Sequence, residues 1–310
     1  MTKKNLILLL LLFIIAAVGI AFSASEAPDD PTKKGYIGAE TCKGCHETQF
    51  ETYSKSIHSK KAVKGPEYKE ACETCHGAGA KHVEKGGGRG VDIFDFGKKV
   101  DPKSRAAKCL SCHDETPHLA NWNLSRHSAA DVVCNDCHSV HSQGIKNLKM
   151  KEPELCYTCH LSIRSQANRQ SHHPIKEGKI TCSACHDPHG EFGSKMIKAD
   201  SINELCYKCH AEKRGPYMWE HPPVEENCLN CHVPHGSNHN KLLVRKPPQL
   251  CQSCHALSGH PATPYTSFET IQGAATASKN RMMIRGCVNC HSNVHGSNSI
   301  QGTRGQRDIR

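Results

Sequence analysis

The feature that most constrains this 310-residue chain is a five-residue motif, Cys-x-x-Cys-His, which occurs ten times. The ten copies use all 20 cysteines, so none is left for another purpose. At these Cys and His frequencies, chance would supply only about 0.1 copies. The chemistry of c-type haem explains the spacing, because two thiols add to the two haem vinyl groups and the adjacent His reaches the iron from one face. The motifs therefore predict ten covalently attached haem c groups.

The covalent and proximal ligands follow directly from the motifs. The predicted attachment residues are Cys42, Cys45, Cys72, Cys75, Cys109, Cys112, Cys134, Cys137, Cys156, Cys159, Cys182, Cys185, Cys206, Cys209, Cys228, Cys231, Cys251, Cys254, Cys287 and Cys290. The predicted proximal iron ligands are His46, His76, His113, His138, His160, His186, His210, His232, His255 and His291. A disulfide framework explains an even number of cysteines but not a His after every second one. Zinc sites need paired Cys pairs or a His pair at finger spacing, which the repeated Cys-His dipeptide does not provide.

The remaining histidines are distributed along the whole chain. Every interval that follows a motif contains at least one of them. One per interval gives the predicted distal iron ligands His58, His82, His127, His141, His173, His189, His221, His235, His260 and His295. His118, His172 and His239 are then left over. This pattern predicts ten haems that each have two axial histidines and no open iron position.

The position of the distal candidate alternates along the chain. It lies 12, 14, 13, 11 and 5 residues after the proximal His of odd-numbered motifs, and 6, 3, 3, 3 and 4 residues after that of even-numbered motifs. The repeat is therefore a two-haem module in five copies, at about 38–100, 101–147, 148–198, 199–243 and 244–298. A His three residues after a proximal ligand can hardly pass the porphyrin edge, so we expect His141, His189 and His235 to bind the iron of a neighbouring haem.

These features favour a multihaem cytochrome c fold, mostly irregular with short α-helices, in which an extended string of haems forms the core. Only 37% of residues are hydrophobic and 5% aromatic. Motif spacings of 22 to 37 residues leave room for a short helix and a turn per haem. We expect helical turns around the motifs, including the stretch from Glu204 to Arg214. The glycine-rich run 86–90 predicts a flexible loop, and residues 299–310 a flexible tail.

The N-terminus has the pattern of an export signal. Lys3 and Lys4 precede an apolar run from Leu6 to Phe22, and small residues follow at Ser23. We assign residues 1–24 to a signal peptide and 25–298 to the decahaem domain, and expect a periplasmic protein. Retention of residues 6–22 as a membrane anchor is the alternative.

The formal charge of +10 is offset by the predicted haems. Removal of the signal peptide leaves +8, and ten oxidised haems with ionised propionates, each roughly −1, give a mature protein of about −2. The basic residues then compensate propionates, and we expect no nucleic-acid partner.

Several stretches carry a family resemblance: CYKCHAEKRGPYMWEHPPVEENCLNCHVPHGS at 206–237, CHDPHG at 185–190, PQLCQSCH at 248–255 and CVNCHSNVHGSN at 287–298. With them, the chain resembles the MtrA/DmsE decahaem cytochromes from about residue 38 to 298. The distal His pattern of that family matches the ten residues chosen above. His118, His172 and His239 depart from it.

The resemblance implies a role in outer-membrane porin–cytochrome conduits. In such a conduit, the haem string lies inside a β-barrel porin. It would take electrons from a periplasmic or inner-membrane donor cytochrome and pass them to an extracellular multihaem cytochrome or acceptor. We therefore expect an electron carrier associated with the outer membrane rather than an enzyme. A soluble periplasmic shuttle remains the first alternative, and a multihaem reductase is the second.

Overall fold

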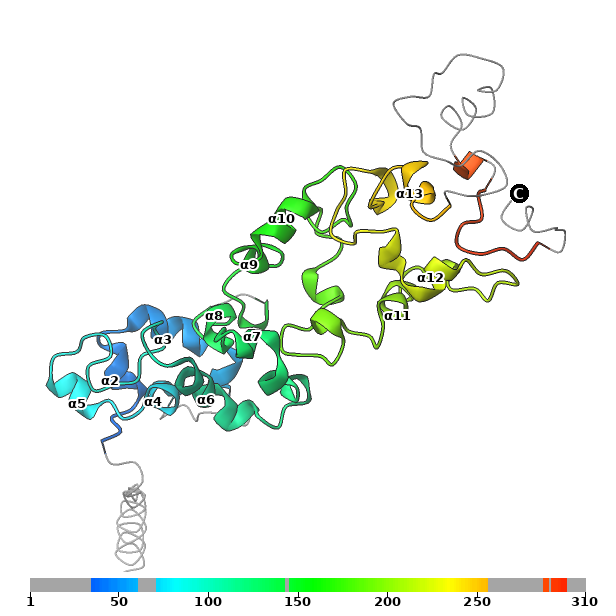
Figure 1. Cartoon of the computed structure of the whole chain (residues 1–310). Helices are drawn as coiled ribbons and strands as arrows, with labels where there is room; N and C mark the ends of the chain where they lie inside the picture. The colour runs from blue at the N-terminus through cyan, green and yellow to red at the C-terminus, as the bar shows by residue number, and fades with distance from the viewer. Residues whose placement is uncertain (1–34, 61–70, 143–144, 256–286, 290, 300–310) are drawn as a thin grey trace, which may run out of the picture. The chain divides into compact units, whose positions relative to one another are not determined.

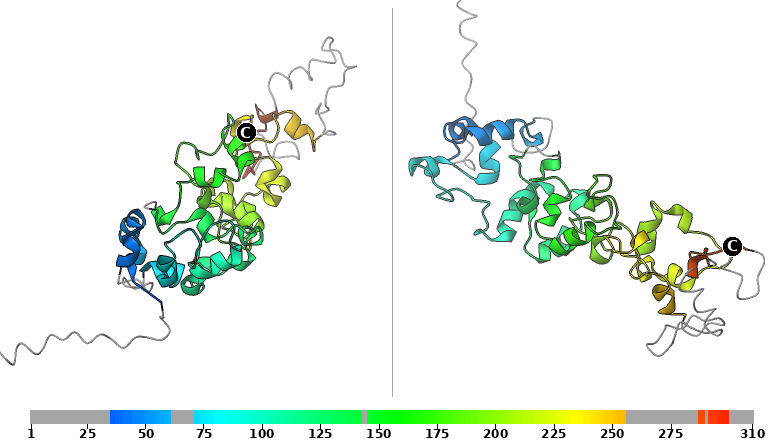
Figure 2. Two further views of the ribbon diagram at one scale, coloured as in Figure 1. Left: turned by 90° about the vertical axis from the view of Figure 1, so that its left-hand side faces the viewer. Right: turned by 90° about the horizontal axis from the view of Figure 1, so that it is seen from above.

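The computed structural model describes residues 35–60, 71–142, 145–255, 287–289 and 291–299. In these residues short helices are joined by irregular segments, and strand-like pairing is limited to isolated bridges (Figures 1 and 2). This confirms the expected multihaem fold class with short helices. None of the described helices is long and apolar enough to cross a membrane. The predicted signal peptide, residues 300–310 of the tail, His260 and Cys290 lie outside the described residues.

Most of the helices contain or adjoin a motif. The α-helices are α2 Ala39–Lys43, α3 Glu47–Ser54, α4 Ala71–His76, α5 Ala80–Glu84, α6 Pro102–His113, α7 Arg126–Ala129, α8 Cys134–Cys137, α9 Glu154–Tyr157, α10 Leu161–Ala167, α11 Ile202–Tyr207, α12 Pro222–Glu226 and α13 Gln249–Gln252. The 3-10 helices are η2 Ile57–Ser59, η3 Pro117–Leu119, η4 Trp122–Leu124, η5 Ile145–Asn147, η6 Cys182–Ala184, η7 Ser194–Met196, η8 Ala211–Lys213, η9 Cys228–Asn230, η10 Asn240–Leu242 and η12 Cys287–Asn289. The sixth, eighth and tenth motifs begin in 3-10 helices, and the others in α-helices.

Local capping explains where α6 and α11 begin. At α6, the Asp101 carboxylate accepts a hydrogen bond of 2.8 Å from the Ser104 N–H, and proline occupies the first turn. At α11, the Ser201 hydroxyl oxygen accepts from the Glu204 N–H at 3.2 Å. The helical stretch expected as far as residue 214 is divided into α11 and η8, because the seventh motif ends the first of these turns.

The chain divides into two compact units. The first includes the described residues 35–45 and 71–95, with α2, α4 and α5. At its centre Glu73 is only 1% exposed. Its carboxylate accepts hydrogen bonds from the backbone N–H groups of Ile37 at 3.0 Å, Gly38 at 2.9 Å and Gly79 at 2.8 Å. This buried carboxylate therefore holds the segments before α2 and α5 on α4.

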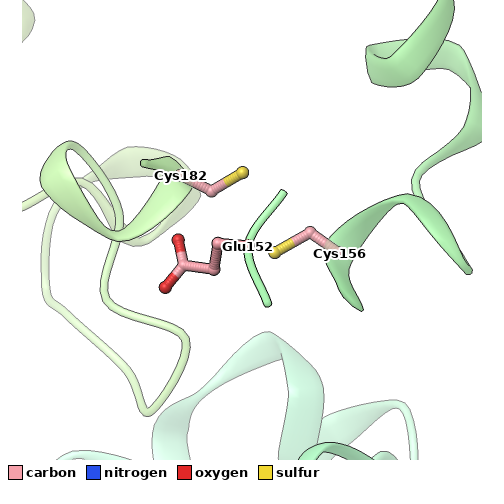
Figure 3. A group of neighbouring side chains, drawn as sticks. All are labelled: Glu152, Cys156 and Cys182. Atoms are coloured by element: carbon pink, nitrogen blue, oxygen red, sulfur yellow. The ribbon is translucent and has the colours of Figure 1, made fainter. Parts of the chain in front are cut away.

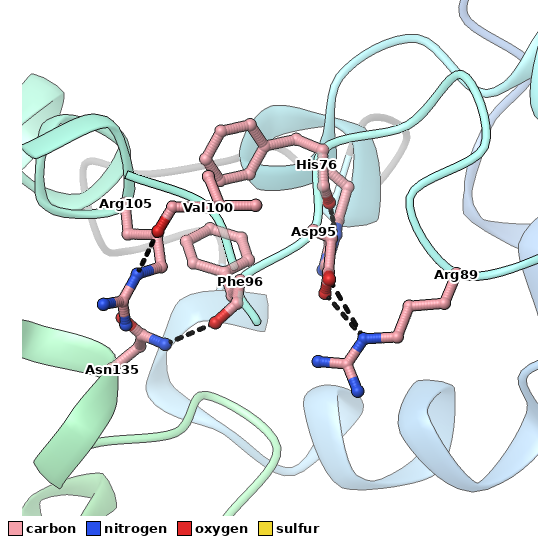
Figure 4. Close-up of polar contacts among 8 residues, drawn as sticks. His76, Arg89, Asp95, Phe96, Val100, Arg105 and Asn135 are labelled. Carbon is pink, nitrogen blue, oxygen red and sulfur yellow. Dashed lines mark hydrogen bonds and ion pairs between the residues drawn. The ribbon is translucent and has the colours of Figure 1, made fainter. Parts of the chain in front are cut away.

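The glycine-rich run 86–90 belongs to the same unit. It forms a loop, as predicted, with turns in which Gly86, Gly87, Gly88 and Gly90 have positive φ. The Arg89 guanidinium pairs with the Asp95 carboxylate at 3.0 Å (Figure 4).

The second unit includes residues 46–60 and the described chain from 96 onward. Its hydrophobic cluster consists of Ala106, Trp122 and Val133, with Leu110 and Leu119 packed against it. Few other large apolar side chains are buried in the described residues. This small polypeptide core agrees with the expectation that haem supplies much of the interior.

A buried arginine fixes the fourth motif in this unit. Arg105 of α6 is 4% exposed and donates to Val100 O at 3.2 Å and Asn135 Oδ1 at 2.9 Å (Figure 4). It also pairs with Asp136 Oδ1 at 3.3 Å, and Asn135 in turn donates to Phe96 O at 2.8 Å. Because Asn135 and Asp136 are the two variable residues of the fourth motif, this network holds α8 on α6.

Candidate haem-binding sites

Each motif from the fourth to the tenth is closed by one backbone hydrogen bond. The N–H of the motif His donates to the carbonyl of the first Cys, at 2.8–3.1 Å. The bond joins His138 to Cys134, His160 to Cys156, His186 to Cys182, His210 to Cys206, His232 to Cys228, His255 to Cys251 and His291 to Cys287. One helical turn thus brings the first thiol and the imidazole close together. This is the local arrangement that covalent attachment plus proximal ligation requires.

Seven motif histidines face a second imidazole across a nearly constant gap. The ring centres are 6.0–6.4 Å apart. The pairs are His113 with His58, His160 with His127, His138 with His189, His210 with His173, His186 with His235, His255 with His221, and His232 with His295. When two imidazoles bind the same metal ion from opposite sides, each through a bond of about 2 Å, their ring centres lie about 6 Å apart. The side chains therefore fit a bis-histidine haem at all seven positions.

A simple rule relates the partners. An odd-numbered motif faces the histidine of the interval two motifs earlier, as His113 faces His58. An even-numbered motif faces the histidine two motifs later, as His138 faces His189. His189 and His235 therefore face motifs other than their own, as their short offsets predicted. The sequence did not indicate which motif receives each histidine.

The ring planes also differ between the two classes. The imidazoles opposite the fourth, sixth and eighth motifs are nearly parallel to the motif His, at 18°, 19° and 8°. Those at the third, fifth and seventh motifs are inclined by 75°, 66° and 48°. The ninth pair, at 22°, is again close to parallel.

Backbone carbonyls fix the proton on many of these rings. Among distal candidates, Nδ1 of His127 donates to Pro188 O at 2.9 Å, that of His173 to Pro234 O at 2.6 Å, and that of His221 to Val294 O at 3.0 Å. A carbonyl can only accept, so Nδ1 carries the proton and Nε2 keeps its lone pair for a metal. Such hydrogen bonds orient metal-binding imidazoles and raise their basicity.

The predicted proximal histidines of the fourth, sixth and eighth motifs use a different acceptor. Nδ1 of His138, His186 and His232 donates to the carbonyls of Lys146, Lys195 and Lys241 at 2.9, 3.0 and 2.8 Å. Each of these lysines lies in a short turn, η5, η7 or η10, and has φ of 56–59°. A left-handed conformation costs a non-glycine residue about 1–2 kcal/mol. The recurrence of this strained turn after three motifs indicates that it serves the imidazole. Sequence reasoning missed it, although a lysine recurs 8–9 residues after these three motif histidines.

Burial favours the neutral form of several distal candidates. It lowers the pKa values of His58, His189, His235 and His295. Neutral imidazole is the form that binds metal, so these side chains are suited to ligation before any metal arrives.

The structure distinguishes His173 from its neighbour His172. His173 faces His210 with ring centres 6.4 Å apart. The His172 ring instead has Nδ1 2.6 Å from Arg169 O and Nε2 3.1 Å from a Glu177 carboxylate oxygen. Both nitrogens of His172 are thus engaged away from a motif, which leaves His173 as the ligand candidate.

The attachment thiols of successive motifs lie close together. First cysteines pair as Cys42 with Cys72, Cys109 with Cys134, Cys156 with Cys182, Cys206 with Cys228, and Cys251 with Cys287. As thiols they perturb each other: a hydrogen bond with Cys109 lowers the pKa of Cys134 to about 7. Burial, together with neighbouring Cys228, raises the pKa of Cys206 to about 12. These five pairs match the five predicted two-haem modules.

Second cysteines link one module to the next. Cys137 interacts electrostatically with Cys159, Cys185 with Cys209, and Cys231 with Cys254. Throughout the described part of the second unit, each motif from the third to the ninth therefore has a thiol near a thiol of the next motif.

One thiol pair also lies beside a carboxylate. Ligand atoms of Glu152, Cys156 and Cys182 lie within 4.8 Å of one another, a spacing that could hold a metal ion (Figure 3). Both cysteines, however, are the predicted haem-attachment residues that begin the fifth and sixth motifs. The Glu152 carboxylate already accepts a hydrogen bond from the Ser183 N–H at 2.8 Å. Glu152 therefore joins the two motifs and does not mark a separate metal site.

These paired motifs and apposed imidazoles define a multihaem c-type cytochrome. A family model described as "Doubled CXXCH motif" matches residues 127–164, 172–215 and 221–259, and one described as "Cytochrome c554 and c-prime" matches 41–71. The chain is 40% identical to the multiheme cytochrome MtrA of Shewanella baltica over 274 residues, which cover 87% of this chain and 81% of the relative. The chain belongs to the MtrA family of multihaem cytochromes. It binds haem c covalently and is an electron carrier.

More distant relatives are also multihaem cytochromes. The chain is 24% identical to the C-type polyheme cytochrome OmcB of Geobacter sulfurreducens, over 97% of this chain and 42% of that protein. It is 23% identical to a high-molecular-weight cytochrome c of Nitratidesulfovibrio vulgaris, over 48% of this chain and 25% of that protein. The doubled-motif matches combine motifs four and five, six and seven, and eight and nine. These are the motif pairs whose second cysteines lie close together. The two-haem modules predicted above instead pair the motifs whose first cysteines lie close together.

Proposed function

We propose that all ten haems are held between two histidines and that electrons pass along them in the order of the motifs. The supporting observation is the set of seven imidazole pairs with ring centres 6.0–6.4 Å apart, each joining a motif His to a distal candidate. For the remaining motifs, the proposed distal ligands are His82, His141 and His260. The succession of thiol contacts from motif to motif supports the proposed order, because the thiols mark the attached edge of each haem.

The haems supply reversible one-electron chemistry at iron. The chain's own residues occupy both axial positions. Burial lowers the pKa of four distal candidates, and backbone carbonyls accept the Nδ1 proton of three others. Because no ligand has to leave on reduction, little rearrangement accompanies electron transfer. The same saturated coordination leaves no position for substrate at the seven described pairs, which argues against a reductase.

Coordination can be tested on the purified holoprotein. Intact mass and a haemochrome titration should give ten haems per chain. Low-temperature EPR should show only low-spin ferric iron, and the dithionite-reduced native protein should not bind CO rapidly. A stable high-spin signal or fast CO binding would show an open iron and would refute bis-histidine ligation of all ten haems.

We further propose that the protein is exported to the periplasm and carries electrons across the outer membrane inside a β-barrel porin. Membership of the MtrA family and the resemblance to porin–cytochrome conduits support this proposal. A loop-rich polar backbone could not face lipid with its hydrogen bonds unmet, so a chain crossing the membrane needs a sheath. Barrels of about 16–18 strands leave only an aqueous channel, so we expect a larger one. The proposed partners are the porin, an extracellular multihaem cytochrome and a donor cytochrome of the periplasm or inner membrane.

Fractionation separates the conduit from a soluble shuttle. We expect the cytochrome to remain with outer membranes and to co-purify in detergent with one large β-barrel protein. Deletion of that barrel should release or destabilise the cytochrome and abolish reduction of extracellular acceptors. Quantitative release from wild-type cells by osmotic shock, with no barrel attached, would favour the soluble shuttle instead.

A further inference from the structure

Three tripeptides in the second unit each contribute to the candidate axial ligands of two haems. They are Pro188-His189-Gly190, Pro234-His235-Gly236 and Val294-His295-Gly296, here called the His-Gly elements. The central His of each faces an even-numbered motif, the fourth, sixth or eighth. The first residue of each offers its carbonyl to Nδ1 of the distal His facing the next motif, the fifth, seventh or ninth. Each element therefore joins the axial ligands of two successive haems.

The glycine allows the close approach on which this contact depends. A Cβ on Gly236, where φ is +156°, would lie 2.0 Å from Gln166 O. A Cβ on Gly190, where φ is +119°, would lie 2.4 Å from Asn121 O. No side chain fits at either distance, and glycine alone adopts such backbone angles readily. The second element is also held by a reciprocal pair of hydrogen bonds, 2.8 and 3.0 Å long, between the backbones of Ser171 and Ser237. Ser171 lies two residues before His173, so this packing fixes the His173 ring against Pro234 O.

The chain contains a natural exception. The corresponding tripeptide after the fourth motif is Val140-His141-Ser142, which lacks the glycine. The distal candidate facing the third motif is His58, whose ring centre lies 6.1 Å from that of His113. Its Nδ1 is buried and has no hydrogen-bond partner among the residues that the structure describes. The glycine and the hydrogen bond are thus missing together.

We propose that the His-Gly elements are positioning residues that set reduction potentials, and that the His58–His113 haem has a higher potential than the haems of the fifth, seventh and ninth motifs. The inference rests on the ligand assignment of the proposed function. A hydrogen bond from Nδ1 to a carbonyl makes imidazole a more basic donor, and a more basic donor stabilises ferric iron. The three haems with this bond should therefore be harder to reduce than the one without it.

Two ligand variants locate these potentials in the wild-type holoprotein. His58→Met and His173→Met should each raise the potential of one haem, because thioether ligation favours ferrous iron. Comparing each variant with wild type in a spectroelectrochemical titration shows which wild-type potential has disappeared. We expect the potential lost in His58→Met to be higher than the one lost in His173→Met. An equal or lower value would overturn the inference. If neither variant shifts a single haem, the ligand assignment itself fails.

A glycine variant tests the role of the second His-Gly element directly. Gly236→Ala should force the second element away from Gln166, lengthen the contact between His173 and Pro234 O, and raise the potential of the His173 haem alone. All ten haems should remain low-spin. The matched control is Gly178→Ala, where φ is +69° but a Cβ would meet nothing within 4 Å. Unchanged potentials in Gly236→Ala, or an equal shift in Gly178→Ala, would contradict the role of the element. Should Gly236→Ala fail to mature, the wild-type comparison still decides the question.

Discussion

The buried carboxylate of Glu73 offers a quantitative test of how the first unit is held together. In Glu73→Gln, one carboxylate oxygen becomes an NH₂ group of similar size. In the wild type, one oxygen accepts from Gly79 and the other from Gly38, and the Ile37 N–H donates to both. In either orientation of the amide, at least one backbone N–H would face another donor. The variant therefore removes hydrogen bonds with almost no change in packing.

The magnitude follows from the number and burial of these bonds. A hydrogen bond to a charged group contributes about 1.5–3 kcal/mol and a neutral one about 1 kcal/mol, while a buried donor left without an acceptor costs about 1–3 kcal/mol. One lost acceptor and two weakened bonds should destabilise this contact by about 3 kcal/mol. Since each 1.4 kcal/mol is a factor of ten, local opening should become roughly 100-fold more frequent.

Hydrogen exchange measured by mass spectrometry on the holoprotein detects such local opening. The amides of Ile37, Gly38 and Gly79 should exchange roughly 100-fold faster in Glu73→Gln, with the haem content unchanged. The control is Glu84→Gln, which removes the charge of an exposed carboxylate in the same unit. If the three amides exchange as in wild type, Glu73 does not hold the unit and our reasoning is wrong.

Three further outcomes are expected. His221→Met should retain ten haems and raise the reduction potential of one of them. His172→Ala should leave every haem low-spin; a high-spin haem in this variant would show that His172, and not His173, binds the iron. EPR should resolve two classes of low-spin haem, because the angle between the two imidazole planes sets the splitting of the iron d orbitals. We expect rhombic signals from the near-parallel pairs, whose planes are 8–19° apart, and large-g signals from the pairs at 66° and 75°. One uniform signal would contradict the pairing. Haem-free chain should be disordered and protease-sensitive, since its apolar burial is too small to offset the ordering entropy; calorimetry that shows a cooperative transition would reveal a polypeptide core we have missed.

Local chemistry explains why much of this protein could be predicted from its sequence. A haem attachment site needs two thiols and an imidazole within five residues, so the motif itself specifies cofactor and proximal ligand. The short helices follow from the same spacing, and the alternating offsets of the distal candidates predicted the two-haem modules. The sequence also predicted that His189 serves a haem other than its own, because three residues can hardly pass a porphyrin edge, and the His189 ring faces the His of another motif.

For the seven described imidazole pairs, the tertiary structure decides which motif each distal candidate faces. Apposed rings come from different motifs, and nothing in the local sequence around His58 indicates that it faces His113. The carbonyls that fix the imidazoles are equally remote: Pro188 O is 61 residues from His127, and Val294 O is 73 residues from His221. A backbone carbonyl has no side-chain signature, so its role depends only on where the chain passes. The sequence by itself predicts how many haems are bound and which residues attach them, because those bonds are local. The folded path determined which histidine meets which motif and which rings gain a hydrogen bond, because those contacts join distant segments.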